Sequence, residues 1–90
     1  MTKLVEVYRK MNDYFLREVY INPKQVVVMR RDDSMKSNLN EGLLPENLNG
    51  DQSFTKIYVD RGTSGLDITV VGDPTYIKEK LGIDNRSLLK

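Results

Sequence analysis

The stretch from Ser53 to Gly82, SFTKIYVDRGTSGLDITVVGDPTYIKEKLG, constrains the fold more than any other part of the chain. Successive side chains in Ser53–Arg61 and in Leu66–Gly72 fall into two alternating sets, one for each face of a strand. Gly62 and Gly65 lie between the two runs and permit the positive φ angles of a short hairpin loop. The sequence therefore predicts an antiparallel hairpin in this stretch.

The same stretch ends in a short segment that carries helix signals at both ends. Asp73 is expected to be the N-cap, and Pro74 suits the first helical position because it has no N–H to satisfy. Ile77 and Leu81 are four residues apart and share one face of the predicted helix. Gly82 supplies the left-handed residue that commonly ends a helix. We therefore predict a helix bounded by Asp73 and Gly82.

The N-terminal third of the chain predicts three more strands. Lys3–Arg9 is rich in β-branched and aromatic residues. Tyr14–Ile21 fits either a strand or a helix, and we favour a strand because a short helix would leave Lys3–Arg9 unpaired. Asn22 and Pro23 predict a single helical turn. Gln25–Arg31 follows as a strand, and its three consecutive valines indicate a strand that is covered on both faces.

A long connection, Asp32–Ser53, separates these strands from the C-terminal hairpin. It spans 22 residues, which is longer than most connections in compact domains. We interpret it as an inserted loop in which Leu43, Leu44 or Leu48 tucks against the body of the protein. These three leucines are also the candidate partner-binding residues, in a loop that orders on contact. The alternative is a mobile loop without a role.

Length and composition predict one domain over residues 1–90 with a short tail at 84–90. The hydrophobic content of 39% and charged content of 30% suit a globular domain. We expect a mainly β (α+β) fold, a small antiparallel sheet or open barrel of about five strands with one short C-terminal helix. No apolar run is long enough to span a membrane, no signal-peptide core is present, and cysteine is absent. We therefore expect a cytoplasmic protein with no membrane association.

The chain contains neither histidine nor cysteine, which excludes most familiar catalytic and metal sites. We therefore expect no cofactor, no metal site and no enzyme activity. Asp32 and Asp33 form the one adjacent acidic pair and are interpreted as a solvated pair at a strand end. Asp60 and Asp67 flank the glycine loop, where they could face each other but are expected to serve the local turn.

Charge is distributed unevenly along the chain. Residues 1–31 hold seven basic and three acidic residues, although the net charge of the chain is only +1. Aromatic and cationic residues alternate over the three predicted N-terminal strands, which is typical of a sheet face that stacks bases and contacts phosphates. This pattern supports a possible nucleic-acid face made of Tyr8, Arg9, Tyr14, Arg17, Tyr20, Arg30 and Arg31.

Two stretches, YINPKQVVVM and FTKIYVDRGTSGLDITVVGDPTYIKEKLG, resemble the FlbD-like small proteins associated with flagella and swarming motility. The resemblance covers residues 20–31 and 54–82 and implies the same order of short strand, Asn-Pro turn, strand, hairpin and closing helix. It implies no catalytic residues. The chain departs from that family in its longer first hairpin and in the Asp32–Ser53 connection. A small accessory protein of phage type would share the same features.

These observations favour a non-enzymatic interaction or regulatory module that binds a protein partner or itself. Self-association would use an exposed strand edge such as Lys3–Arg9, giving a homodimer. The alternative function is binding of RNA or single-stranded DNA through the Tyr/Arg-rich residues.

Overall fold

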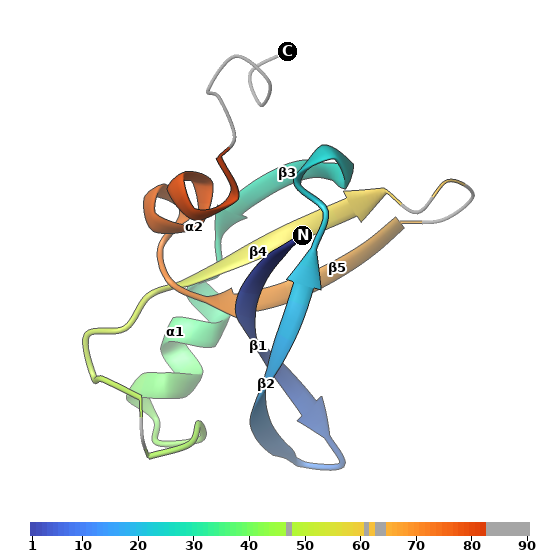
Figure 1. Cartoon of the computed structure of the whole chain (residues 1–90). Helices are drawn as coiled ribbons and strands as arrows, with labels where there is room; N and C mark the ends of the chain where they lie inside the picture. Colours follow the sequence, from blue (N-terminus) through green and yellow to red (C-terminus); the bar gives the residue numbers. More distant parts are fainter. Residues whose placement is uncertain (47, 61, 63–64, 83–90) are drawn as a thin grey trace.

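Five antiparallel strands form one open sheet, in the order β2-β1-β5-β4-β3 (Figure 1). A computed structural model describes residues 1–46, 48–60, 62 and 65–82. Over these residues the fold is mainly β, as expected, with two α-helices and one 3-10 turn. The elements are β1 (Thr2–Lys10), β2 (Asp13–Ile21), η1 (Pro23–Gln25), β3 (Val26–Arg31), α1 (Asp33–Asn40), β4 (Phe54–Asp60), β5 (Gly65–Val71) and α2 (Pro74–Leu81).

Strands β1 and β2 form a long, regular hairpin. Their pairing runs without interruption from Thr2 opposite Ile21 to Lys10 opposite Asp13. The strand interpretation of residues 14–21 is therefore confirmed. In contrast, β1 pairs with β5 only through Glu6 and Val7. The hairpin thus joins the rest of the sheet through a short contact and then diverges from it (Figure 1).

The second hairpin, β4 and β5, forms as the alternation predicts, from Phe54 opposite Val71 to Asp60 opposite Gly65. Gly62 has the expected positive φ, 89°, but Gly65 does not have a positive φ and begins β5. Strand β3 pairs with the other side of β4 and lies at the edge of the sheet.

The prediction that the valines of β3 are covered on both faces was wrong. The exposed fractions of Val27 and Val28 are 54% and 36%. The pairing of β3 with β4 shifts register between Val26 and Val28, which indicates a bulge or irregularity. Consecutive apolar residues can arise in a doubly covered strand or, as here, in an irregular edge strand. The sequence alone does not distinguish these cases.

Each face of the sheet carries a small hydrophobic core, because successive side chains of a strand point to opposite faces. Helix α2 covers the first core with two of its residues, and the connection after β3 covers the second. The first core contains the buried residues Leu4, Ile21, Ile57, Val59, Val70, Ile77 and Leu81. The second contains the buried residues Val7, Leu44 and Phe54, with Tyr14, Leu16, Met35, Leu39, Leu48 and Val71 packed against them.

Helix α2 has the predicted ends. The Asp73 side chain accepts a hydrogen bond from the Tyr76 N–H at 2.8 Å, and Pro74 begins the helix. Gly82 ends it with a φ of 69°. The predicted tail at 84–90 lies outside the described residues.

Helix α1 lies within the connection that was predicted to be a loop, so that prediction was wrong. Asp32 is its N-cap, and Asp32 Oδ1 accepts a hydrogen bond from the Met35 N–H at 3.0 Å. Asp32 Oδ2 accepts a second one from the Thr69 hydroxyl on β5 at 2.7 Å. Asp32 is therefore buried and is not half of a solvated pair, because its carboxylate joins the helix to the sheet.

The rest of the connection also packs against the sheet. Leu44 lies in the second core with an exposed fraction of 6%, and Leu48 packs partly buried against the same core. Lys36 Nζ donates hydrogen bonds to the carbonyl oxygens of Gly50 and Gln52, at 3.1 and 2.8 Å.

Within the described residues, no helix is both long and apolar enough to cross a membrane.

Candidate interaction site at the edge of strand β2

The sheet has two outer strands, β2 and β3, and β1 lies inside it. The sequence-based choice of Lys3–Arg9 as the exposed edge was therefore wrong. Strand β1 is paired along its full length with β2, which places β2 on the outside. Pairing partners of a strand depend on contacts distant in sequence, which local alternation does not encode.

The outer edge of β2 is long and regular. The strand has nine residues, contains neither proline nor glycine, and its pairing with β1 shows no register shift. The hairpin has a two-residue loop closed by Lys10 and Asp13, so this closing pair exchanges backbone hydrogen bonds. Alternation along the strand then directs the N–H and C=O groups of every second residue away from β1. These residues are Tyr14, Leu16, Glu18 and Tyr20.

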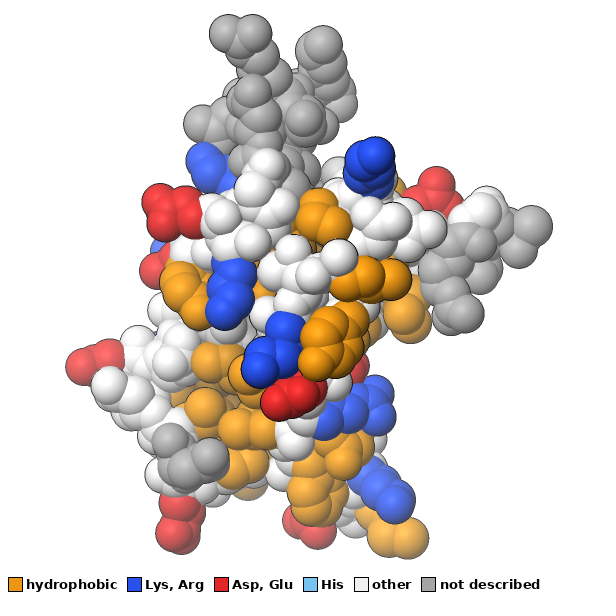
Figure 2. Space-filling view, in the orientation of Figure 1, with side chains coloured by type: hydrophobic (Ala, Val, Ile, Leu, Met, Phe, Trp, Pro, Cys, Tyr) orange, Lys and Arg blue, Asp and Glu red, His pale blue; other side chains and the backbone are white. Residues whose placement is uncertain are grey.

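Nothing in the described part of the chain covers these outward backbone groups. No turn, loop or helix among the described residues donates a backbone hydrogen bond to them or accepts one from them. An uncovered edge of this kind can pair with another extended strand. Figure 2 shows hydrophobic side chains lying between charged ones over the front of the β1–β2 hairpin.

On one face of the hairpin, four side chains form a connected polar and aromatic cluster. Arg17 Nε donates to Glu6 Oε1 at 2.8 Å, and Glu6 is buried beneath it. This hydrogen bond raises the pKa of Arg17 above its ordinary value. Arg17 Cζ lies 4.1 Å from the centre of the Tyr8 ring, and the Tyr8 and Phe15 ring centres are 5.7 Å apart. Phe15 is left with an exposed fraction of 41%.

The opposite face of β2 borders the second core. Tyr14 and Leu16 pack against that core, and Asn38 on α1 donates a hydrogen bond to the Tyr14 hydroxyl at 3.2 Å. Nearer the other end of the strand, the exposed fraction of Tyr20 is 59%. Glu18 lies 3.7 Å from Lys3 Nζ in a solvent-exposed ion pair. Both faces of β2 therefore present partly exposed apolar and charged groups next to the open edge.

The seven residues of the predicted nucleic-acid face do not share a face, and that part of the prediction was wrong. Tyr8 and Arg17 point to one side of the hairpin, because Tyr8 pairs with Phe15 and Glu6 with Arg17. Alternation places Arg9, Tyr14 and Tyr20 on the other side.

Two of the seven are also separated from the rest across the sheet. Arg30 and Arg31 lie on β3, at the opposite edge from β2, and as successive residues they point to opposite faces. The prediction placed the three N-terminal strands on one sheet face, whereas β5 and β4 lie between β1 and β3. Four of the seven residues still lie in close cation–aromatic pairs, Arg17 with Tyr8 and Arg9 with Tyr14.

The three leucines proposed to bind a partner have different surroundings. Leu44 is a core residue, so a partner could contact it only if the second core opened. Leu48 is half-buried in the same place, and Leu43, with an exposed fraction of 52%, is the exposed member of the three. The structure therefore gives no support to a binding surface formed by all three.

The acidic residues considered for chemistry are dispersed. Asp32 caps α1, and Asp33 follows it with an exposed side chain. Asp60 accepts a hydrogen bond from the Gly62 N–H at 2.8 Å, which is the expected local turn contact. Asp67 pairs with Tyr58 and so does not face Asp60. Across the described ranges, no three acidic side chains are grouped so that they could hold a metal ion.

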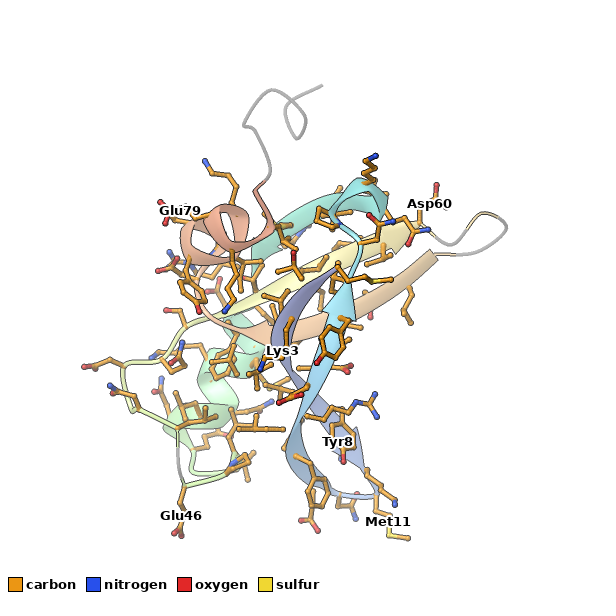
Figure 3. All side chains as sticks on the ribbon, in the orientation of Figure 1. Lys3, Tyr8, Met11, Glu46, Asp60 and Glu79 are labelled. Carbon is orange, nitrogen blue, oxygen red and sulfur yellow. The ribbon has the colours of Figure 1, made fainter. Side chains whose placement is uncertain are left out.

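A pocket of about 420 Å³ opens where β1 diverges from β5. Lys3 and Val5 line it from β1, and Tyr76 and Lys80 line it from α2. Lys80 Nζ lies 5.8 Å from the Tyr76 ring centre. Figure 3 shows Lys3 near the middle of the molecule and Tyr8 farther down the hairpin. The pocket and the cluster around Tyr8 are thus separate features.

Sequence reasoning missed β2 as the open edge, although one signal was present. Tyr14–Ile21 combines large apolar residues on both faces with charges at its centre, which is typical of a strand exposed at a sheet edge.

The chain matches no protein-family model, and comparisons with curated proteins and with solved structures found no match. The resemblance to the FlbD-like family stays a prediction.

Proposed function

We propose that this chain is a non-enzymatic interaction module that binds an extended protein segment along the outer edge of β2. The uncovered backbone of that nine-residue strand is the observation that carries the proposal. Strand addition supplies main-chain hydrogen bonds, and neighbouring side chains select the incoming segment. Phe15 and Tyr20 supply exposed apolar contacts on opposite faces, and Arg17 supplies a positive charge.

The small size of the domain also favours a binding role for this edge. Its apolar side chains are divided between two small cores, one on each face of the sheet. A domain of about this size buries a limited share of its surface, so an added strand would increase its stability by mass action.

Binding of single-stranded nucleic acid is the second candidate function. The Arg17–Tyr8 and Arg9–Tyr14 pairs support it, because bases stack on aromatic rings and phosphates contact cations. The two pairs lie on opposite faces of the hairpin. A single strand of nucleic acid would therefore contact one pair at a time, which makes this candidate the weaker one.

A matched pair of substitutions at Glu18 tests the proposed function. Glu18→Thr and Glu18→Pro both remove the exposed ion pair with Lys3, which contributes little stability. Only proline also removes the outward N–H, and an edge strand tolerates proline where that N–H faces solvent. We expect tagged wild-type and Glu18→Thr chains to retain the same proteins from a lysate of the native host, with or without nuclease treatment. The Glu18→Pro chain should lose them.

Circular dichroism and thermal unfolding establish first that the Glu18→Pro chain is folded. If the folded proline variant retains the same proteins as the wild type, the edge of β2 is not the binding site. If nuclease treatment removes everything that the wild type retains, the second candidate function replaces the first.

A further inference from the structure

We infer that the segment bound by β2 is the β2 strand of a second copy of this chain, paired antiparallel about a two-fold axis at Leu16. The inference rests on the proposed function, because it names the partner of the same edge. Each copy would contribute an identical strand, as in other isologous dimers. Three outward-facing residues of one copy, Tyr14, Leu16 and Glu18, would then exchange backbone hydrogen bonds with the same three residues of the other.

Alternation restricts how two copies of β2 can pair. Residues directly opposite one another in an antiparallel sheet point to the same face, so the two-fold axis must pass through a residue position. The three central positions of β2 are Leu16, Arg17 and Glu18. An axis at Arg17 places two Arg17 side chains directly opposite each other, and an axis at Glu18 places two Glu18 side chains opposite each other. Both arrangements oppose like charges and are destabilising.

The axis at Leu16 opposes complementary side chains. Phe15 then lies opposite Arg17 of the second copy, which already contacts an aromatic ring within its own chain. Tyr14 lies opposite Glu18 of the second copy, so a hydroxyl faces a carboxylate. The paired segment extends from Asp13 to Val19 and so uses most of the strand. Among the three central axes, the one at Leu16 is therefore the one that opposes no like charges, and in it a cation faces a ring and a hydroxyl faces a carboxylate. This self-complementarity of the strand points to a second copy in this register.

The same register also extends the second core. Leu16 would meet its counterpart at the axis, and both leucines already pack at the margin of that core. Pairing therefore removes apolar surface of Leu16 and Tyr14 from water on one face and of Phe15 on the other.

Sedimentation equilibrium over a range of protein concentrations tests self-pairing. We expect the average mass of the wild type to rise from 10.4 kDa toward twice that value. Glu18→Thr keeps the backbone N–H but loses the carboxylate that faces Tyr14, so it should dimerise slightly less tightly than the wild type. Glu18→Pro also loses two symmetry-related hydrogen bonds, so it should weaken the dimer by about tenfold or more relative to Glu18→Thr. A wild-type chain that remains monomeric to about millimolar concentration, where even weak pairing would be visible, overturns the inference.

Cysteine cross-linking tests the register, and the absence of native cysteine makes the background clean. With the axis at Leu16, Asp13 lies opposite Val19 of the second copy. This pair is not hydrogen-bonded, so its Cα atoms are about 4.5 Å apart, within disulfide range. An equimolar mixture of Asp13→Cys and Val19→Cys chains should therefore form a disulfide-linked dimer on mild oxidation, and neither chain alone should. None of these positions belongs to the Glu6–Arg17 pair.

A second mixture reports the competing register. With the axis at Arg17, Phe15 lies opposite Val19, so Phe15→Cys and Val19→Cys chains would cross-link instead. Efficient cross-linking of this second mixture alone overturns the Leu16 register.

The failure of the inference can be told apart from the failure of the proposed function. If the wild type is monomeric while Glu18→Pro still abolishes protein capture, the edge binds another protein and only the inference fails. If Glu18→Pro changes neither capture nor mass, both fail.

Discussion

Met11 has a φ of 59° at the tip of the β1–β2 hairpin, where its exposed fraction is 89% (Figure 3). A residue with a Cβ atom is strained in this left-handed region by about 1–2 kcal/mol, and glycine is not. A glycine at this position would remove the strain, but part of the resulting stabilisation is lost because glycine has more conformational freedom in the unfolded chain.

We therefore predict that Met11→Gly raises the free energy of unfolding by about 0.5–1 kcal/mol. Chemical denaturation measures the change. Asn12→Gly is the control, because Asn12 lies in the same turn without a positive φ, and it should bring no gain. Equal stabilisation by both substitutions would show that strain at Met11 is not the cause.

The role of Asp32 shows where residue-level prediction stops. Its position after a strand and before a polar segment suggested a solvated side chain. Its two hydrogen bonds, to the Met35 N–H and to the Thr69 hydroxyl, join positions that are 3 and 37 residues away. The first partner lies within reach of a local N-cap signal, and Met35 and Leu39, four residues apart, were further signs of a helix. The second partner depends on how the strands pair.

At the scale of elements, the connection after β3 is a structural component. Leu43 and Leu44 are adjacent in sequence, yet their exposed fractions are 52% and 6%. We predict that Leu44→Ala lowers the free energy of unfolding by about 2–4 kcal/mol, because it leaves a cavity in the second core. Leu43→Ala should change it by less than about 0.5 kcal/mol. Thermal and denaturant unfolding of the two variants makes the comparison, and equal losses would contradict the packing described above.

The elements with strong local signals were predictable. Alternation predicted the strands β4 and β5. Capping residues and prolines predicted the 3-10 turn at Pro23 and both ends of α2. The choice of a strand for Tyr14–Ile21 followed from the need to pair its neighbour. The strand order did not follow from the sequence, because β1 lies between β2 and β5 and pairs with β5 through two residues only. The candidate site depends on that order, so the wrong edge was chosen.

At the scale of the whole molecule, pairing through β2 predicts that thermal stability depends on concentration. A partner that binds only the folded chain raises its apparent stability as concentration increases. We predict that the midpoint of thermal unfolding of the wild type rises with protein concentration, whereas that of Glu18→Pro begins to rise only at a concentration about tenfold higher or more. Differential scanning calorimetry over a wide concentration range measures this, and identical behaviour of the two chains would argue against β2 pairing.

The two outer strands of the sheet differ in a way that limits the size of any assembly. Strand β2 has nine residues and pairs without a register shift. Strand β3 has six residues, shifts register near Val27 and is followed directly by α1. Irregular, short edges resist the addition of further strands. A chain with one edge competent for pairing is monovalent: when two such edges meet, none is left to recruit a third copy. The same asymmetry that opens β2 to a partner would thus make the product a closed pair and protect it from growing into a fibre.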